Sequence, residues 1–208
     1  MTHNKLDINN SSILVYGIGT KGMEYPAYIR KKPLAEYTMW KRMLERCSID
    51  YPAKYPTYTG VTCSDNFKSY SYFYKWCQEQ VGFGNKDENG SSWQLDKDIL
   101  IKGNKLYSED TCCFVPQSIN KLTNICKSTR GDAPIGTHLV KRTGKYSAYL
   151  QREGARISLG YYNTASEAFS VYKVAKEAYV KQVAEKYKNV LDERLYQALI
   201  NYKVFEND

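Results

Sequence analysis

The 208-residue sequence lacks the features that would place it among membrane-spanning, secreted or disulfide-rich proteins. It has no Cys-x-x-Cys pair among six cysteines, only two histidines, and no run approaching the roughly 18 consecutive apolar residues that a membrane span requires. Its polar start, Met1-Thr2-His3-Asn4-Lys5, has no secretory signal pattern. Hydrophobic residues at 42% and charged residues at 25% are typical of a chain that buries a core. We therefore expect a folded cytoplasmic protein with reduced thiols and no membrane partner.

The cysteines do not favour a zinc site. Cys47, Cys63 and Cys113 could approach one another from separate strands, but structural zinc sites usually draw their ligands from closely spaced pairs. The other interpretation is that these thiols are buried and behave as small apolar side chains. The sequence favours that second interpretation.

Positive charge is concentrated in the later part of the chain. The formal net charge is +8, and residues 130–188 hold 11 basic and 5 acidic side chains. A local excess of this kind favours a polyanion as partner, nucleic acid above all, because binding releases condensed counterions. A solvated basic face without a partner is the alternative.

The first two-thirds of the chain predict helices and a compact mixed unit. Apolar residues recur at helical spacing over 34–47 and again over 66–81, where we expect an aromatic stripe to lie in the core. The pattern Gly17-Ile18-Gly19-Thr20-Lys21-Gly22 matches a dinucleotide-binding loop, but Pro26 and Pro33 interrupt the helix that such a loop requires. We interpret it as a glycine turn. Residues 94–126 then predict a strand, a turn-rich loop, a strand and a helix.

The last third predicts a sheet followed by helices. A polar segment, 127–132, is the best candidate for a linker. Three alternating runs, 135–141, 145–152 and 156–161, predict antiparallel strands joined by turns at Thr143-Gly144 and Glu153-Gly154. Thr164 and Glu167 have the spacing of a capping box, which predicts a helix over 165–187, and a last helix is expected over 192–204.

Three ordered clusters of residues together resemble the phage-encoded HNH-like endonucleases that carry a C-terminal AP2-type DNA-binding domain. The resemblance covers residues 16–202. The clusters are Tyr37, Trp40, Met43, Arg46 and Cys47; then Leu95–Asp98 with Gly103, Asn104, Tyr107, Ser108 and Cys113–Pro116 with Ile119 and Asn120; then Lys145, Tyr146, Ala148, Leu159, Gly160, Tyr162, Thr164, Glu167 and Ala168.

The resemblance implies an α+β fold in two domains. Residues 1–128 form the HNH-like domain, helical and irregular at first, with a ββα-metal-like unit at about 93–126. Residues 129–208 form the AP2-like domain, a three-stranded antiparallel sheet with a C-terminal helix.

The resemblance also implies a site for one divalent metal ion, Mg²⁺ or Mn²⁺, that polarises a scissile phosphate. By motif position, Asp96 is the acidic metal ligand, Asn104 is the loop asparagine that orients the general base, and Asn120 is the ligand on the helix. The sequence departs from the motif at the base itself, because Lys97 stands where the family has histidine.

Two other residues could take part in the chemistry. Lys97, protonated at neutral pH, could neutralise charge in the transition state. Asp98 shares a strand face with Asp96 and could share the metal or accept a proton. The alternative is that Asp96, Lys97 and Asp98 form a solvated charged turn.

For the C-terminal domain the resemblance implies a sheet laid in the major groove of double-stranded DNA. Residues 135–161 carry a net charge of +4. The expected contacts are Lys141, Arg142, Lys145, Tyr146, Arg152 and Arg156.

The resulting hypothesis is a metal-dependent hydrolase: a homing-type or host-directed DNA endonuclease targeted by its C-terminal domain. The alternatives are a catalytically inactive DNA-binding protein, acting as a regulator or counter-defence factor, and an RNA-binding module that stacks bases on its aromatic residues. The target sequence, nicking or double-strand cutting, and the oligomeric state are left open.

Overall fold

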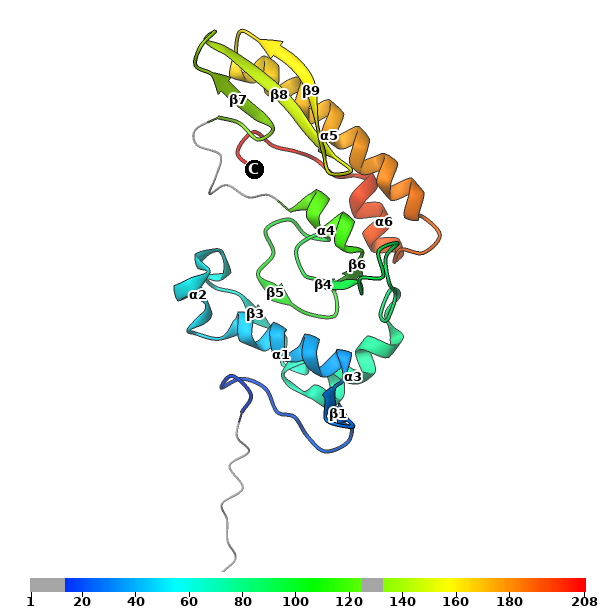
Figure 1. Ribbon diagram of the computed structural model, residues 1–208. Coiled ribbons are helices and arrows are strands. Elements are labelled where there is room, and N and C mark those ends of the chain that lie inside the picture. Colours follow the sequence, from blue (N-terminus) through cyan, green and yellow to red (C-terminus); the bar gives the residue numbers. More distant parts are fainter. Residues whose placement is uncertain (1–13, 125–132) are drawn as a thin grey trace, which may run out of the picture. The chain divides into compact units, whose positions relative to one another are not determined.

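The computed structural model describes residues 14–124 and 133–208, which form a mixed α+β protein (Figure 1). The α+β class and the three-stranded antiparallel sheet predicted from the sequence are confirmed. No helix in these ranges is both long enough and apolar enough to cross a membrane. The helices are α1 (Ala35–Cys47), α2 (Tyr51–Lys54), α3 (Tyr70–Glu79), α4 (Gln117–Thr123), α5 (Ala165–Tyr187) and α6 (Glu193–Ile200), with short 3₁₀ turns η1 (Pro56–Tyr58) and η2 (Asn66–Lys68).

The chain divides into two compact units. Unit 1 comprises the chain up to Gly84 together with Leu95–Cys113, and unit 2 comprises Asn85–Gln94 and Phe114–Asp208. The predicted domain boundary at 128/129, the linker at 127–132 and Cys126 lie outside the described residues. Each unit therefore contains two separate segments of the chain. The composition of the sequence does not mark the positions at which the chain passes from one unit to the other.

The core of unit 1 is aromatic. α1 buries Tyr37, Trp40, Met43 and Leu44, which recur at helical spacing and so lie on one face. The aromatic stripe over 66–81 is also buried, as predicted, but the helix is broken there: η2 ends at Lys68, and Ser69 caps α3 by accepting a hydrogen bond from the Tyr72 amide. Trp40 Nε1 donates to the Phe67 carbonyl across 2.8 Å, which satisfies the buried indole.

Short paired β-segments complete this part of the chain. β1 (Tyr28–Ile29) and β2 (Lys32–Pro33) form an antiparallel hairpin. β4 (Gln94–Asp96) pairs with β6 (Cys113–Val115), and α4 follows β6, which is the predicted order of strand, loop, strand and helix. The loop was not expected to contain β5 (Leu106–Tyr107), which pairs in parallel with β3 (Thr62–Cys63) from much earlier in the chain.

Unit 2 is built on the sheet β7 (Thr137–Val140), β8 (Lys145–Arg152) and β9 (Ala155–Tyr162), in that order. Figure 1 shows α5 lying along one face of this sheet, where Leu150, Phe169, Tyr172 and Val204 form the core. The predicted capping box at the start of α5 is present in full, because Thr164 and Glu167 each bond the other's backbone amide.

A β-bulge interrupts the alternation of β9. Ala148 pairs with Gly160 and Tyr149 with Ser158, so Leu159 has no partner of its own on β8. After the bulge, Tyr161 lies opposite Ser147 and Tyr162 opposite Tyr146.

Candidate nucleic-acid interface and acidic cluster

The sheet of unit 2 has one covered face and one open face. Side chains alternate along a strand, so Ala148, Leu150 and Arg152 of β8 share the face covered by α5, where Ala148 and Leu150 are buried. The intervening residues point the other way. We call that side the exposed sheet face; its register places there His138, Ser147, Tyr149, Gln151, Arg156, Ser158 and Tyr161.

The exposed sheet face carries an arginine stacked on a tyrosine. The Cζ atom of Arg156 on β9 lies 3.6 Å from the centroid of the Tyr149 ring on β8. Gln151 lies opposite Arg156 in the register, and Tyr161, also on this face, is 64% exposed. Stacking holds the guanidinium plane while leaving its N–H groups at the edge for an outside acceptor.

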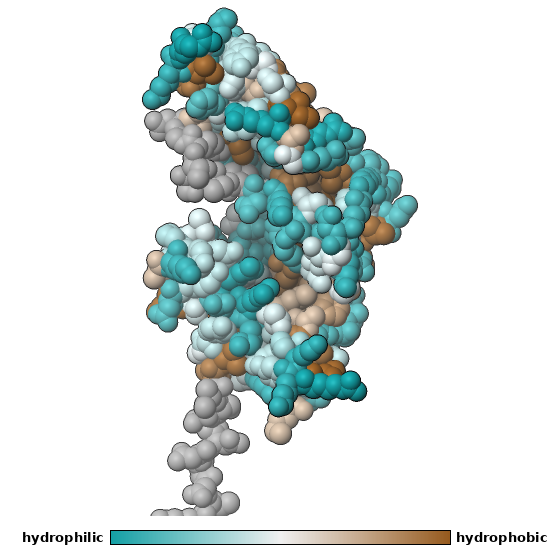
Figure 2. Space-filling view, viewed as in Figure 1, coloured by the Kyte–Doolittle hydropathy of each residue, from teal (hydrophilic) through white to brown (hydrophobic). Residues whose placement is uncertain are grey.

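Three further cations lie at the turn between β7 and β8. Lys141 and Arg142 belong to the turn and Lys145 begins β8, and all three are exposed. Figure 2 shows hydrophilic side chains gathered at the end of the sheet that carries this turn. These cations are therefore available to an anionic partner, as the sequence predicts for DNA contacts.

Two of the six predicted DNA contacts lie elsewhere. Arg152 faces α5, and its Cζ lies 5.1 Å from the ring centroid of Tyr179 on that helix. Tyr146 is half-buried and pairs with Tyr162 and Leu139. Strand alternation places both side chains on the covered side, so Arg152 and Arg156 do not form one surface.

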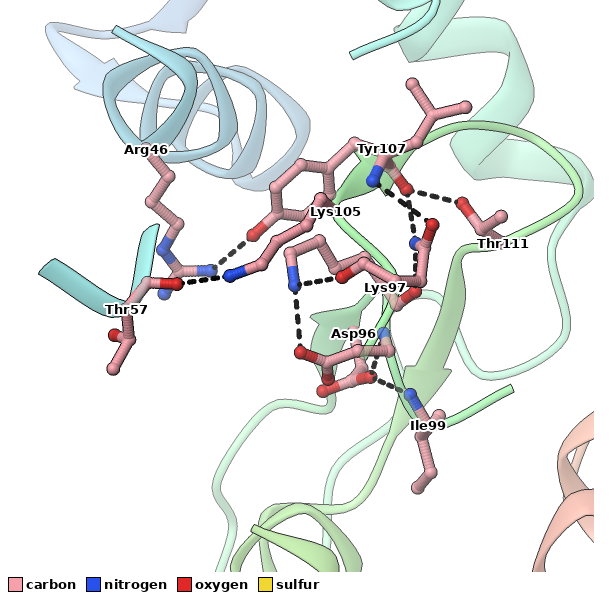
Figure 3. Close-up of polar contacts among 11 residues, drawn as sticks. Arg46, Thr57, Asp96, Lys97, Ile99, Lys105, Tyr107 and Thr111 are labelled. Carbon is pink, nitrogen blue, oxygen red and sulfur yellow. Dashed lines mark hydrogen bonds and ion pairs between the residues drawn. The ribbon is translucent and has the colours of Figure 1, made fainter. Parts of the chain in front are cut away.

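The second candidate site, the Asp96 cluster, comprises Asp96, Lys97, Asp98 and Asn104 in unit 1. Figure 3 shows Asp96 and Lys97 with their polar contacts. Asp96 Oδ1 accepts hydrogen bonds from the amides of Asp98 (2.9 Å) and Ile99 (2.8 Å), as in an Asx turn. Burial, with the nearby charge of Asp98, raises the pKa of Asp96 to about 6. The two carboxylates are thus close enough for one to oppose ionisation of the other.

Lys97 is buried, with 7% exposure. Its Nζ donates to Asp98 Oδ2 at 2.8 Å and to the Asn104 carbonyl at 3.0 Å, and it lies 5.7 Å from the Tyr107 ring centroid. The ammonium is therefore paired inside the cluster, contrary to the alternative of a fully solvated charged turn.

Both polar atoms of the Asn104 side chain form hydrogen bonds with backbone groups. Its Nδ2 donates to the carbonyls of Lys97 and Leu106, both at 2.6 Å, and its Oδ1 accepts from the Leu106 amide at 3.2 Å. Asn104 thus holds the backbone of Lys97 in place. Asn120 lies on α4 in unit 2, where its amide donates to Gln94 Oε1 at 2.9 Å.

Arg46 and Tyr107 lie beside the cluster, and the sequence did not predict either of them as a site residue. Arg46, at the end of α1, donates through Nη1 to the Tyr107 hydroxyl at 3.3 Å, and Figure 3 shows the two side chains meeting. Burial raises the pKa of Tyr107. Nothing in the local sequence links positions 46 and 107, because the contact depends on how α1 packs near β5.

The donor chemistry of the cluster fits a hard divalent cation with few protein ligands. Mg²⁺ commonly takes one or two carboxylates and completes its shell with water and phosphate oxygens. Asp96 and Asp98 supply two carboxylates, each with one oxygen outside the hydrogen bonds just described. Within residues 14–124 and 133–208, no three His, Cys, Asp or Glu side chains are grouped to hold a metal ion.

Comparisons with known proteins return no match for this chain among protein-family models, curated proteins or solved structures.

Proposed function

We propose that this protein binds double-stranded DNA through the exposed sheet face of unit 2, acting as an AP2-like DNA-binding domain. The Arg156–Tyr149 stack is the observation that carries the proposal. It presents a planar, oriented guanidinium on the side of the sheet that α5 leaves open.

The geometry suits two kinds of contact, one that recognises bases and one that binds the phosphate backbone. An arginine fork can donate to the two acceptors on a guanine edge, while lysines bind phosphate as point charges. Arg156 and Gln151 would contact bases in the major groove. Lys141, Arg142 and Lys145 would hold the phosphate backbone and fix the position of the sheet on the duplex.

Two arginines on opposite sides of one hairpin give a matched test. Arg156→Ala is expected to weaken binding to a mixed-sequence duplex about 10-fold or more, since a bidentate base contact is worth about 1–3 kcal/mol. Arg152→Ala removes the same charge from the covered face, and we expect it to leave binding within about 2-fold of wild type, within the roughly 0.5 kcal/mol expected of a residue outside the interface. Fluorescence anisotropy titrations measure both.

The cations at the β7–β8 turn are tested by salt dependence. Replacing Lys141, Arg142 and Lys145 with glutamine is expected to reduce the slope of log K against log salt by about 0.9 for each phosphate that is no longer neutralised. If this variant and Arg156→Ala both titrate like wild type at two salt concentrations, the sheet is not the interface.

A second candidate function is metal-dependent DNA cleavage by an HNH-like endonuclease site at the Asp96 cluster. The Asp96–Asp98 carboxylate pair favours it, together with the grip of Asn104 on the carbonyl of Lys97. Asp96 and Asp98, both in unit 1, would hold Mg²⁺ or Mn²⁺. When bound, the ion would polarise the scissile phosphate and stabilise the leaving oxygen.

In this function Lys97 and Asn104 would stabilise charge and hold the backbone in place, and neither would remove a proton. Lys97 is a cation held at a fixed place, where it could offset charge on the phosphate undergoing attack. Asn104 fixes the backbone from which Lys97 projects.

Supercoiled plasmid with Mg²⁺ or Mn²⁺ tests the second candidate. Cleavage by wild type that is lost in Asp96→Asn but kept in Asp50→Asn, which removes an exposed carboxylate on another segment, would support it. Nicked product indicates one cut strand and linear product two. Intact plasmid with normal duplex binding would instead support the catalytically inactive DNA-binding protein.

A further inference from the structure

The β1–β2 hairpin of unit 1 has an unusual turn. Tyr28 pairs with Pro33 and Ile29 with Lys32, which leaves Arg30 and Lys31 as a two-residue connection. The backbone angle φ is +47° at Arg30 and +66° at Lys31, so both adopt the left-handed conformation that a type I′ turn requires.

Arg and Lys are poor choices for this backbone. Type I′ turns strongly prefer Asn-Gly because a side chain at positive φ is strained. Arg30, Lys31 and the following Lys32 are all exposed, and none of them forms an ion pair within the described part of the chain. A strained conformation with no internal compensation is a reason to look for a partner outside the protein.

A groove lies between this hairpin and α1. It is open to solvent, has a volume of about 240 Å³, and is lined by Tyr16, Tyr28 and Pro33 together with residues of α1. The α1 residues that line it are Tyr37, Thr38, Lys41, Arg42 and Glu45. We call the groove and the hairpin tip together the hairpin–α1 patch.

The rings of the groove are partly open to solvent. Tyr28 and Tyr37 pack with their centroids 5.3 Å apart, and Tyr28 and Tyr16 remain 49% and 42% exposed. Lys41 lies 5.9 Å from the centroid of Tyr37. Exposed tyrosine rings can stack with the bases of a single strand, and neighbouring cations without an ion-pair partner can bind its phosphates.

The charge of the patch is strongly positive. Its cations are Arg30, Lys31, Lys32, Lys41 and Arg42, against Glu45 as the carboxylate lining the groove. Glu36, also on α1, is buried and accepts a hydrogen bond from Gln78 at 2.7 Å. Glu36 therefore faces away from solvent and is not available to pair with these cations.

We propose that the hairpin–α1 patch binds an unpaired DNA strand, with bases on Tyr16 and Tyr28 and phosphates on the hairpin and α1 cations. Bases in a duplex are stacked within the helix and cannot enter a tyrosine-lined groove, so the occupant is a single strand. The inference rests on the proposed function in taking DNA as the partner, but it uses different residues in a different unit.

The turn itself offers a sharp variant. Arg30→Asn with Lys31→Gly installs the sequence that a type I′ turn prefers, so the hairpin is expected to gain stability while the patch loses two cations. Weaker binding by this variant could not result from unfolding. Lys54→Gln with Lys105→Gln removes two cations from another exposed part of unit 1 and is the matched control.

The full-length protein is titrated with a fluorescein-labelled dT12 strand at several salt concentrations. We expect Arg30→Asn/Lys31→Gly and Lys41→Gln/Arg42→Gln each to weaken binding about 10-fold and to reduce the salt slope by about 0.7 for each phosphate that is no longer neutralised. Tyr16→Leu/Tyr28→Leu is expected to weaken binding several-fold with the slope unchanged, because stacking does not release counterions. The control pair is expected to bind like wild type.

Titrations with the mixed-sequence duplex and with a labelled rU12 strand distinguish the possible outcomes. If these patch variants bind dT12 like wild type while Arg156→Ala weakens duplex binding, the inference fails and the proposed function stands. If wild type binds neither dT12 nor duplex, both fail. Tighter binding of rU12 than of dT12 would overturn the assignment to DNA, whereas equal loss by the control pair would overturn the assignment to this patch.

Discussion

Replacing Asn104 with alanine removes three hydrogen bonds that hold together the backbone of the Asp96 cluster. These are the bonds to the Lys97 carbonyl and to the carbonyl and amide of Leu106. A hydrogen bond contributes about 0.5–1.5 kcal/mol net, and more when a buried partner is left unsatisfied. Because the side chain is only half-buried, we expect Asn104→Ala to lower the free energy of unfolding of unit 1 by about 2 kcal/mol.

Asn104→Asp sharpens this prediction. The carboxylate keeps an acceptor for the Leu106 amide but directs a second oxygen at two carbonyl oxygens, so it is expected to destabilise at least as much as alanine. Asn120→Ala is the contrasting variant: its side chain makes an exposed bond to Gln94, and we expect a change within about 0.5 kcal/mol.

Urea unfolding followed by tryptophan fluorescence measures these changes, since Trp40 and Trp76 are both buried in unit 1. If Asn104→Ala unfolds within about 0.5 kcal/mol of wild type, the side chain does not hold the cluster together and the reasoning is refuted. A loss of plasmid cleavage in Asn120→Ala without a loss of stability would identify a role in chemistry instead.

Three other predictions concern the packing of unit 2. Burial lowers the pKa of Lys176 to about 8 from an ordinary 10.5, so between pH 8 and 10.5 the folded state binds fewer protons than the unfolded chain. The free energy of unfolding is therefore expected to rise by up to about 3 kcal/mol as the pH rises from 8 to 10.5. Urea titrations of Lys176→Met should lack this rise. Gly136→Ala would place a methyl group 2.1 Å from the Tyr172 ring at a φ of +75° and is expected to cost more than about 3 kcal/mol in denaturation followed by circular dichroism, against about 1 kcal/mol for Gly144→Ala, which has open space. Thr164→Ala removes the cap of α5 and is expected to cost about 1 kcal/mol in the same assay, and no change would mean that the capping box is not stabilising.

Local patterns in the sequence were enough to predict the elements of this fold that depend on near neighbours. The helical spacing around Trp40 and the capping box at Thr164 each act within one or two turns, and both are observed. The parallel pairing of β5 with β3 joins Thr62 to Leu106, which are far apart in the chain. Its two-residue strands carry no periodicity of their own, so no local signal could predict it.

The candidate sites show the same division between local and long-range signals. A two-residue turn at Glu153-Gly154 makes Arg152 pair with Ala155 and Arg156 with Gln151, so the sequence already implied that the two arginines face opposite ways. The contact of Arg46 with Tyr107, in contrast, depends on tertiary packing and had no signal in the sequence.

The unpaired Leu159 decides which of two adjacent tyrosines meets solvent. With uninterrupted pairing, Tyr162 would share the side of Arg156 and Tyr161 would turn toward α5, whereas the extra residue reverses this arrangement. Deleting Leu159 would make the strand regular and leave both rings on their present sides, whereas keeping Leu159 and pairing it with Ala148 would exchange them. The pairing of a strand, as much as its composition, thus specifies the chemical groups that this surface displays.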